Sequence, residues 1–213
     1  MRNKQSYLYL LILPFIFGCG PNYQYPALPP GAKVLAFGDS LTAGVGAKEG
    51  SDYPSILASK TGWKVFNYGV SGETTEGGIR RFSKVVEEVN PHLIILGLGG
   101  NDFMKGVPER VTKENLKKMI NFSREKNIPI ILFAVPKVSP SNLITSKIGF
   151  SADIHPIYIE IEQEEKILVE KNAAPKIWSS SSLMADNIHP NGEGYKVFVE
   201  DYLIPVFKKE KII

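Results

Sequence analysis

Ser40 stands where a polypeptide chain could present a nucleophile. It lies in the stretch "LAFGDSLTAGVGA" (35–47), in which an apolar run ends at Gly38 and small residues with further glycines follow. A serine that attacks a carbonyl carbon needs a base to accept its proton, a group that orients this base, and N–H donors for the oxyanion. The stretch is therefore either a tight turn that happens to contain a serine or a turn that exposes Ser40 for covalent chemistry.

The chain contains three histidines, and each is a candidate for the base. His189 follows Asp186 by three residues, a spacing that places both side chains on one face of a turn or of a helix start. The carboxylate can then hold one ring nitrogen while the other faces Ser40. His92 lies at the amino end of an expected strand, and His155 opens an expected helix, where a capping or surface role is typical. We therefore expect His189 to be the base and Asp186 to be its orienting group.

The elements that position these residues alternate along the chain from residue 33 onward. A chain of 213 residues with 43% apolar and 22% charged residues is typical of one globular domain. Apolar runs predict five strands, over residues 33–38, 63–69, 92–99, 128–135 and 175–178. Helical spacing of apolar residues predicts helices over 79–89, 156–171 and 195–202, and Thr112 is the expected N-cap of a further helix. The pattern predicts a single α/β domain, a three-layer α/β/α fold with a mostly parallel, doubly wound, five-stranded, flavodoxin-like sheet.

Polar, glycine-rich stretches follow the expected strands. Besides the stretch around Ser40, they are "NYGVSGETT" (67–75), "LGGND" (98–102) and "ADNIHPNGEGY" (185–195). Ligands of a doubly wound sheet bind beyond the carboxyl ends of its strands. We therefore expect all four stretches to meet at one edge of the sheet.

The same four stretches resemble, block for block, the SGNH or GDSL family of serine hydrolases. The matching blocks are "GDSL" (38–41), "GVSGET" (69–74), "GGND" (99–102) and "DNIHP" (186–190), within a resemblance that extends over residues 33–205. The blocks look most like those of the thioesterase I, lysophospholipase and arylesterase branch. The resemblance thus implies an α/β serine hydrolase.

The resemblance implies a role for each matched position. Ser40, Asp186 and His189 are implied to be the catalytic residues. The backbone N–H groups of Ser40 and Gly72 and the side-chain amide of Asn101 are implied to form the oxyanion hole. We expect Gly72 to be a glycine because a side chain there would crowd the substrate.

Other residues of these blocks are expected to shape turns. Gly38 is expected to let the backbone turn sharply, and Asp39 is expected to hydrogen-bond that turn. Glu73, Asp102 and Glu193 are likewise expected to be caps and turn anchors and not catalysts.

The implied function is hydrolysis of carboxylic esters or thioesters of small-molecule or lipid acyl substrates through an acyl-enzyme on Ser40, of the lysophospholipase, arylesterase or acyl thioesterase type. A carbohydrate O-acetyl esterase and a catalytically idle binding lipoprotein are the alternatives. Scattered histidines and one cysteine form no metal-ligand pattern, and no phosphate-binding glycine loop or dinucleotide fingerprint is present, so we expect neither metal nor cofactor. A formal net charge of +3 without a run of like charges gives no support for nucleic-acid binding.

The first residues indicate export and lipid anchoring. Arg2 and Lys4 precede the apolar stretch "YLYLLILPFIFG" (7–18), which suits a signal-peptide core and is too short to span a bilayer. Cys19, the only cysteine, lies in "IFGCG", which resembles a bacterial lipobox. An ordinary secretory signal with an incidental cysteine is the alternative. We expect a lipoprotein signal peptide over residues 1–18, a proline-rich tether over 19–32 and the hydrolase domain over 33–213.

Lipidation of Cys19 implies a protein of the bacterial cell envelope, anchored by its acyl chains. Gly20 stands where inner-membrane retention signals of one type carry an aspartate. By resemblance, this favours the outer membrane, with the protein facing the periplasm or the exterior.

The stretch 136–156 matches the family least. Its prolines and glycine argue against a long regular helix. It carries four large apolar residues, Leu143, Ile144, Ile148 and Phe150. We expect this loop to cover Ser40 and to form one wall of an acyl pocket, with Met104 or Val107 opposite, and local packing on the sheet is the alternative.

Overall fold

The five strands form one sheet in which all neighbours are parallel. In the computed structural model, which describes residues 24–137 and 153–213, the strand order is β2-β1-β3-β4-β5. The strands are β1 (Lys33–Gly38), β2 (Lys64–Gly69), β3 (Leu93–Gly97), β4 (Ile130–Phe133) and β5 (Leu168–Glu170). This is the doubly wound, flavodoxin-like order, and it confirms the expected fold class.

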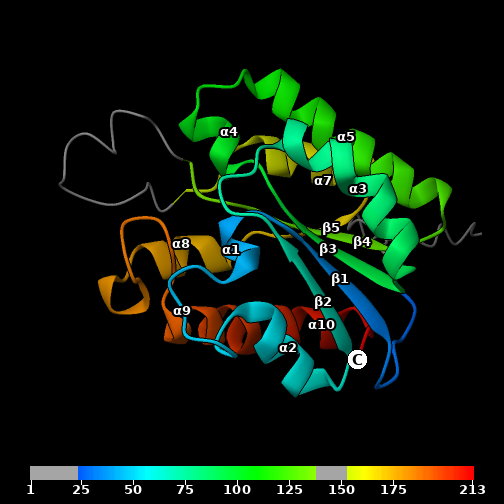
Figure 1. Ribbon diagram of the computed structural model, residues 1–213, viewed down its shortest axis with the longest axis horizontal. Coiled ribbons are helices and arrows are strands. Elements are labelled where there is room, and N and C mark those ends of the chain that lie inside the picture. Colours follow the sequence, from blue (N-terminus) through cyan, green and yellow to red (C-terminus); the bar gives the residue numbers. More distant parts are fainter. Residues whose placement is uncertain (1–23, 138–152) are drawn as a thin grey trace, which may run out of the picture.

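Helices cover both faces of the sheet (Figure 1). One face carries α3 (Thr75–Val89), α5 (Glu109–Glu125) and α7 (Ile157–Glu165). The other carries α2 (Tyr53–Thr61), α9 (Gly192–Val197), a π-helical turn (Phe198–Leu203) and α10 (Ile204–Lys209). Three short helices follow the carboxyl ends of strands: α1 (Ser40–Ala43), α4 (Gly100–Met104) and α8 (Ala173–Trp178). The short helices therefore lie at the edge where ligands of such sheets bind.

The fifth strand lies earlier in the sequence than expected. The helix expected over 156–171 ends at Glu165, because Lys166 adopts a left-handed backbone with φ +52°. The buried run Leu168–Glu170 then pairs with β4 as β5. Residues 175–178, expected to be this strand, belong to α8, which tolerates Pro175 because the first turn of a helix leaves N–H groups without intrahelical acceptors.

Thr112 is not the N-cap of its helix, because α5 begins earlier, at Glu109, after an N-cap at Pro108. Thr112 instead lies buried inside the helix, and its hydroxyl donates to Asp102 Oδ1 at 3.3 Å. A residue that looks like a cap in the sequence therefore supports the adjoining α4.

The apolar core packs against α1 and supports it. Every residue of β3 and β4 is buried, and on the α2 side the rings of Tyr53, Phe133 and Phe198 meet edge to face, with centroids 5.4–5.8 Å apart. The Tyr53 hydroxyl lies 3.2 Å from Thr42 Oγ1, so α1 rests on this aromatic cluster.

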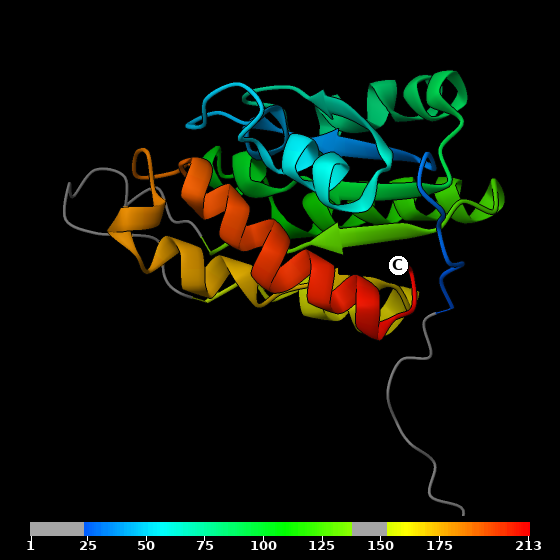
Figure 2. The ribbon, with the colours of Figure 1, turned by 90° about the horizontal axis from the view of Figure 1, so that it is seen from below.

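Residues 25–28 lie at the end of the sheet where the strands begin, opposite the end that carries the short helices (Figure 2). The Tyr25 hydroxyl donates to Ile130 O and accepts from Leu168 N, both at 2.9 Å. The Leu28 N–H donates to Ile212 O at 2.8 Å. The described part of the expected tether thus contacts the amino ends of β4 and β5. Within the described residues, no helix has the length and apolar character needed to cross a membrane.

Candidate active site

Ser40 begins α1 directly after β1. Asp39 caps this helix, because its Oδ1 accepts the Leu41 N–H at 3.0 Å, and its own N–H donates to Gly97 O at 3.2 Å. A Cβ atom on Gly38 would lie only 2.5 Å from Gly97 O. Close packing therefore requires a glycine at position 38. The reason that we expected, a sharp turn of the backbone, is wrong, because Gly38 does not adopt a positive φ.

Ser40, His189 and Asp186 form one chain of hydrogen bonds. The His189 Nε2 lies 3.0 Å from Ser40 Oγ, and the Nδ1 lies 2.8 Å from Asp186 Oδ2. The Asp186 Oδ1 accepts the N–H groups of Ile188 and His189, both at 2.7 Å, so the turn itself orients the carboxylate. In this arrangement a neutral imidazole can accept the serine proton while its second nitrogen is held.

The environment of Asp186 keeps it ionised beside the imidazole. Partial burial raises the pKa of this carboxyl, but the hydrogen bonds from the His189 ring and from the His189 and Ile188 amides outweigh that effect and lower the pKa below its ordinary value. The Asp186 side chain is 53% exposed, so water also solvates its charge. A fixed negative charge in this position favours the protonated form of an adjacent imidazole.

The segment that carries His189 is fastened to the segment after α1. The Tyr195 hydroxyl donates to Val45 O at 2.8 Å. Gly46, with φ +93°, packs so closely that a Cβ atom would lie 2.4 Å from Pro190 O. These contacts explain how two side chains 149 residues apart in the sequence come within hydrogen-bond distance.

Gly72 lies in a tight turn after β2, formed by residues 70–73 and closed by a hydrogen bond from the Glu73 N–H to Val70 O at 3.1 Å. Its φ of +77° is the value that the third position of a type II turn requires, and it favours glycine. A Cβ atom here would meet no atom of residues 24–137 and 153–213 within 4 Å. The positive φ by itself therefore favours glycine at position 72, and the expected crowding of the substrate by a side chain stays a prediction. The Lys105 Nζ donates to Gly72 O at 2.8 Å and ties the 70–73 turn to the end of α4.

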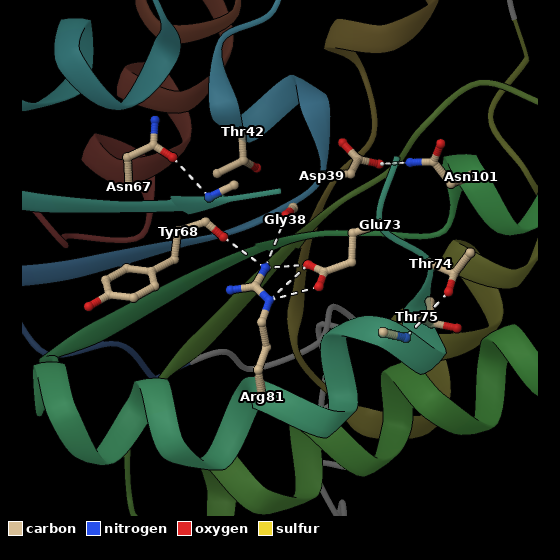
Figure 3. Close-up of polar contacts among 12 residues, drawn as sticks. Gly38, Asp39, Thr42, Asn67, Tyr68, Glu73, Thr74, Thr75, Arg81 and Asn101 are labelled. Carbon is tan, nitrogen blue, oxygen red and sulfur yellow. Dashed lines mark hydrogen bonds and ion pairs between the residues drawn. The ribbon is translucent and has the colours of Figure 1, made fainter. Parts of the chain in front are cut away.

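Asn101 and Asp102, in the first turn of α4, connect the neighbouring loops. The Asn101 Nδ2 donates to Asp39 Oδ2 at 3.2 Å (Figure 3). The buried Asp102 accepts the Thr75 N–H at 2.8 Å and the Thr75 hydroxyl at 2.5 Å. Both aspartates therefore anchor turns, as expected. Glu193, in contrast, lies exposed in the first turn of α9.

Asp39 has an unusual protonation behaviour for a carboxyl group. Complete burial raises its pKa to about 7, and the charges of Asp102 and Glu73 act in the same direction, against the hydrogen bonds from the Leu41 N–H and the Asn101 amide. Hydrogen bonds to an ionised acceptor are the stronger ones. Asp39 consequently holds the Asn101 amide most firmly in its carboxylate form.

The other two histidines lie elsewhere in hydrogen-bond networks of their own. His155 is 3% exposed, so the surface role is wrong, whereas its Nδ1 accepts the Ile157 N–H at 3.5 Å at the start of α7, in line with the expected capping role. Its ring stacks on Phe103 with centroids 3.9 Å apart, and its Nε2 lies 3.2 Å from Glu109 Oε1. His92 is exposed at the amino end of the sheet, where its Nδ1 accepts the Lys33 N–H at 2.9 Å. Of the three, His189 is the one that contacts Ser40.

The three N–H groups that are expected to form the oxyanion hole retain hydrogens for a ligand. In the described part of the chain, no protein acceptor pairs with the backbone N–H of Ser40 or of Gly72, and Asn101 Nδ2 uses one of its two hydrogens on Asp39. The described residues contain no group of three or more His, Cys, Asp or Glu side chains placed to hold a metal ion. The site can therefore supply a nucleophile, a base and amide donors from its own residues.

The apolar residues expected to wall an acyl pocket, Leu143, Ile144, Ile148 and Phe150, lie outside the described residues. The base of their segment is described. Pro136 and Ile154 form an antiparallel bridge, and the Lys137 N–H donates to Asp153 O at 2.8 Å. This base adjoins α4 through the stacked ring of His155.

Arg81, which the sequence analysis did not single out, contacts Glu73 beside the 70–73 turn. No sequence signal marks this contact, because Glu73 precedes α3 and its spacing of eight from Arg81 is not the three or four that pairs side chains along one helix.

Comparisons with known proteins show the family to which this chain is similar. The model of the GDSL-like lipase/acylhydrolase family matches residues 36–197. An arylesterase of Vibrio mimicus is 28% identical over 168 residues, which cover 76% of this chain and 81% of the relative. Thioesterase 1/protease 1/lysophospholipase L1 of Escherichia coli K12 is 24% identical over 194 residues, which cover 90% of this chain and 89% of the relative.

One further relative and one solved structure add to these. An uncharacterized lipoprotein of Bacillus subtilis, YqeF, is 33% identical over 150 residues, which cover 62% of this chain and 58% of the relative. The crystal structure of TesA superposes with a TM-score of 0.71 at 23% identity and covers 84% of this chain and 99% of TesA. This last likeness concerns the fold.

Proposed function

The chain belongs to the GDSL-like lipase/acylhydrolase family and is a carboxylic ester hydrolase, and from this premise we propose that it cleaves ester or thioester bonds of acyl substrates through an acyl-enzyme on Ser40. The observation that carries the proposal is the hydrogen-bonded chain from Asp186 through His189 to Ser40, with distances of 2.8 and 3.0 Å. The arylesterase and the thioesterase/lysophospholipase among the relatives support this class of substrate.

Acylation begins with attack of Ser40 Oγ on the carbonyl carbon. The His189 Nε2 accepts the serine proton, and the resulting imidazolium stays paired with Asp186. Collapse of the tetrahedral intermediate breaks the bond to the leaving alcohol or thiol, which takes the proton from His189. In deacylation, His189 accepts a proton from water, the hydroxide attacks the acyl carbon, and the proton returns to Ser40 Oγ as the free acid leaves.

The charge that develops on the carbonyl oxygen is the largest electrostatic demand of the reaction. We assign its stabilisation to the N–H groups of Ser40 and Gly72 and to the Asn101 amide. Ser40 is the first residue of α1, where a backbone N–H has no intrahelical acceptor, and this leaves its own N–H for the oxyanion. Loss of one such donor typically costs about 3–4 kcal/mol of transition-state stabilisation.

We expect activity on p-nitrophenyl esters to rise with the length of the acyl chain. Each methylene that leaves water for an apolar groove contributes about 0.8 kcal/mol, or roughly four-fold in kcat/KM. A variant that begins at Gly20 is assayed with the series from acetate to dodecanoate, and kcat/KM should increase over the first several carbons and then level off. Lysophosphatidylcholine and an acyl-CoA of the best chain length then distinguish ester from thioester preference.

Two other results would redirect the proposal. Activity confined to acetate would favour a carbohydrate O-acetyl esterase. An absence of hydrolysis together with an absence of fluorophosphonate labelling at Ser40 would favour a binding lipoprotein and contradict the proposed reaction.

We also propose that Cys19 carries lipid and holds the enzyme on the outer membrane, facing the periplasm or the exterior. The lipobox-like "IFGCG" and the lipoprotein among the relatives support the lipid anchor, and Gly20 in place of an aspartate is the feature that favours the outer membrane. From Cys19 to Tyr25 the extended chain reaches about 20 Å at most. Tyr25 contacts the amino ends of β4 and β5, whereas Ser40 follows the carboxyl end of β1 (Figure 2). The active site would then face away from the anchoring membrane, toward substrates in solution or on an opposing surface.

Cys19→Ala should release the protein from membranes and leave catalysis unchanged. The change removes the side chain that the proposal assigns to acylation, and Cys19 has no part in the proposed reaction. The measurement is the esterase activity in the soluble and membrane fractions of cells that express either form. Membrane association of the Cys19→Ala protein that needs detergent to extract would count against the lipid anchor.

A further inference from the structure

The guanidinium of Arg81 lies where β1, β2 and the 70–73 turn meet (Figure 3). Its Nη2 donates to Tyr68 O at 2.9 Å and to Gly38 O at 3.3 Å. Its Nε donates to both oxygens of Glu73, at 2.8 and 3.0 Å, and Nη2 also contacts this carboxylate. One side chain of α3 thus binds three segments that precede or contain groups of the active site.

This ion pair is more enclosed than a surface pair. The Arg81 and Glu73 side chains are 24% and 8% exposed, whereas the neighbouring Arg80 is 70% exposed. The Arg81 guanidinium carbon also lies 3.9 Å from the centroid of the Phe37 ring. Burial of charges costs solvation energy, which only well-aligned partners offset, and the planar fork of arginine suits several acceptors at once.

The residues that Arg81 contacts lie close in sequence to Ser40 and Gly72, whose relative position matters for the proposed reaction. Gly38 is two residues before Ser40, and Glu73 directly follows Gly72. The Val70 N–H also donates to Gly38 O, at 3.0 Å. Gly38 O therefore receives two links from this region, one from the first residue of the 70–73 turn and one from Arg81, which also contacts Glu73 at the far end of the turn.

We propose that Arg81 is a positioning residue for catalysis, which holds the 70–73 turn against the end of β1 so that the Gly72 N–H stays directed at the oxyanion. The proposal rests on the proposed acyl-enzyme mechanism. Arg81 itself contacts neither the nucleophile nor the base, so it acts through the position of Gly72.

Other contacts keep the turn from unfolding when Arg81 is changed. Lys105 holds Gly72 O at 2.8 Å, and Asp102 holds the Thr75 N–H at 2.8 Å, both from α4. Without Arg81 the turn remains tied to α4, and its first residue remains tied to β1 through the Val70 N–H, but its Glu73 end loses its link to β1 and β2. We therefore expect a displaced N–H donor in a folded protein, and catalysis is sensitive to such displacements.

The test compares Arg81→Met and Arg81→Lys with the matched control Arg80→Met on the same helix. Arg81→Met should lower kcat on the best p-nitrophenyl ester by roughly 10- to 100-fold with KM changed less than about three-fold, because one oxyanion donor is misplaced. The rate of labelling by a fluorophosphonate should fall in parallel. Arg81→Lys should recover only part of kcat, since an ammonium cannot reproduce the fork. Arg80→Met should stay within about two-fold of the unchanged protein.

A double variant separates positioning from stability. Arg81→Met leaves the Glu73 carboxylate enclosed and unpaired, which lowers the melting temperature, and adding Glu73→Gln removes that charge. The double variant should regain melting temperature but not kcat. The proposal is overturned if Arg81→Met or Arg81→Lys has the kcat of Arg80→Met, or if kcat returns together with the melting temperature in the double variant. An unchanged protein that neither hydrolyses esters nor reacts with the fluorophosphonate would instead contradict the proposed function.

Discussion

Ser40→Ala is expected to lower kcat by about 10⁴-fold or more while the protein keeps its fold. The change removes the oxygen that forms the acyl-enzyme, so the remaining route is attack by water assisted by His189 and the oxyanion donors, and this route is slow. The measurement is kcat on the best p-nitrophenyl ester, with the mass of the protein recorded after exposure to a fluorophosphonate. An adduct should form on the unchanged protein and not on Ser40→Ala.

The fold should tolerate this change because Ser40 does not cap α1. Asp39 supplies the cap, and alanine is a good helix former, so the melting temperature should shift by no more than about 2–4 °C. Ser179→Ala is the matched control, since this exposed hydroxyl donates to Lys176 O at 3.0 Å. It should hydrolyse esters at the unchanged rate. Hydrolysis by Ser40→Ala at that same rate would refute the covalent mechanism.

Sequence patterns predicted the middle of the sheet because its strands are buried on both faces. The sequences of β1, β3 and β4 are almost continuously apolar, as is typical of strands that are buried on both faces of a parallel sheet. The fifth strand lacks such a signal, since β5 has three residues and directly follows a helix. The left-handed backbone at Lys166 ends the helix before β5 begins. Glycine or asparagine at this position would have indicated such a conformation in the sequence, but lysine does not.

The residues of the site were predictable because each block is contiguous in the sequence. The contacts that join the blocks were not predictable, because they depend on the tertiary fold. Asn101 reaches Asp39 across 62 positions, and Arg81 reaches Gly38 across 43. His155 shows the same limit, since a histidine before a proline reads as a surface residue until its ring is seen stacked on Phe103.

His189→Ala is expected to be nearly as severe as the loss of the serine, with kcat lowered by roughly 10³- to 10⁵-fold. Without the imidazole, the Ser40 hydroxyl has no base at the 3.0 Å that now separates it from Nε2, and the leaving group has no acid. Asp186 cannot substitute, because its carboxylate is held by the amides of its own turn. Added imidazole should restore part of the rate, since it can occupy the space of the missing ring.

The other histidines are the controls that give this result its meaning. His92→Ala changes an exposed ring at the amino end of the sheet and should leave kcat within about two-fold. His155→Ala removes a buried ring that stacks on Phe103, so it should lower the free energy of unfolding by about 2–3 kcal/mol, yet the folded fraction should keep kcat within about ten-fold. Because α4 carries both Phe103 and Asn101, we expect the small decrease of kcat in His155→Ala to come from a shift of the Asn101 amide. Retention of activity in His189→Ala with loss in His155→Ala would mean that a different histidine serves as the base.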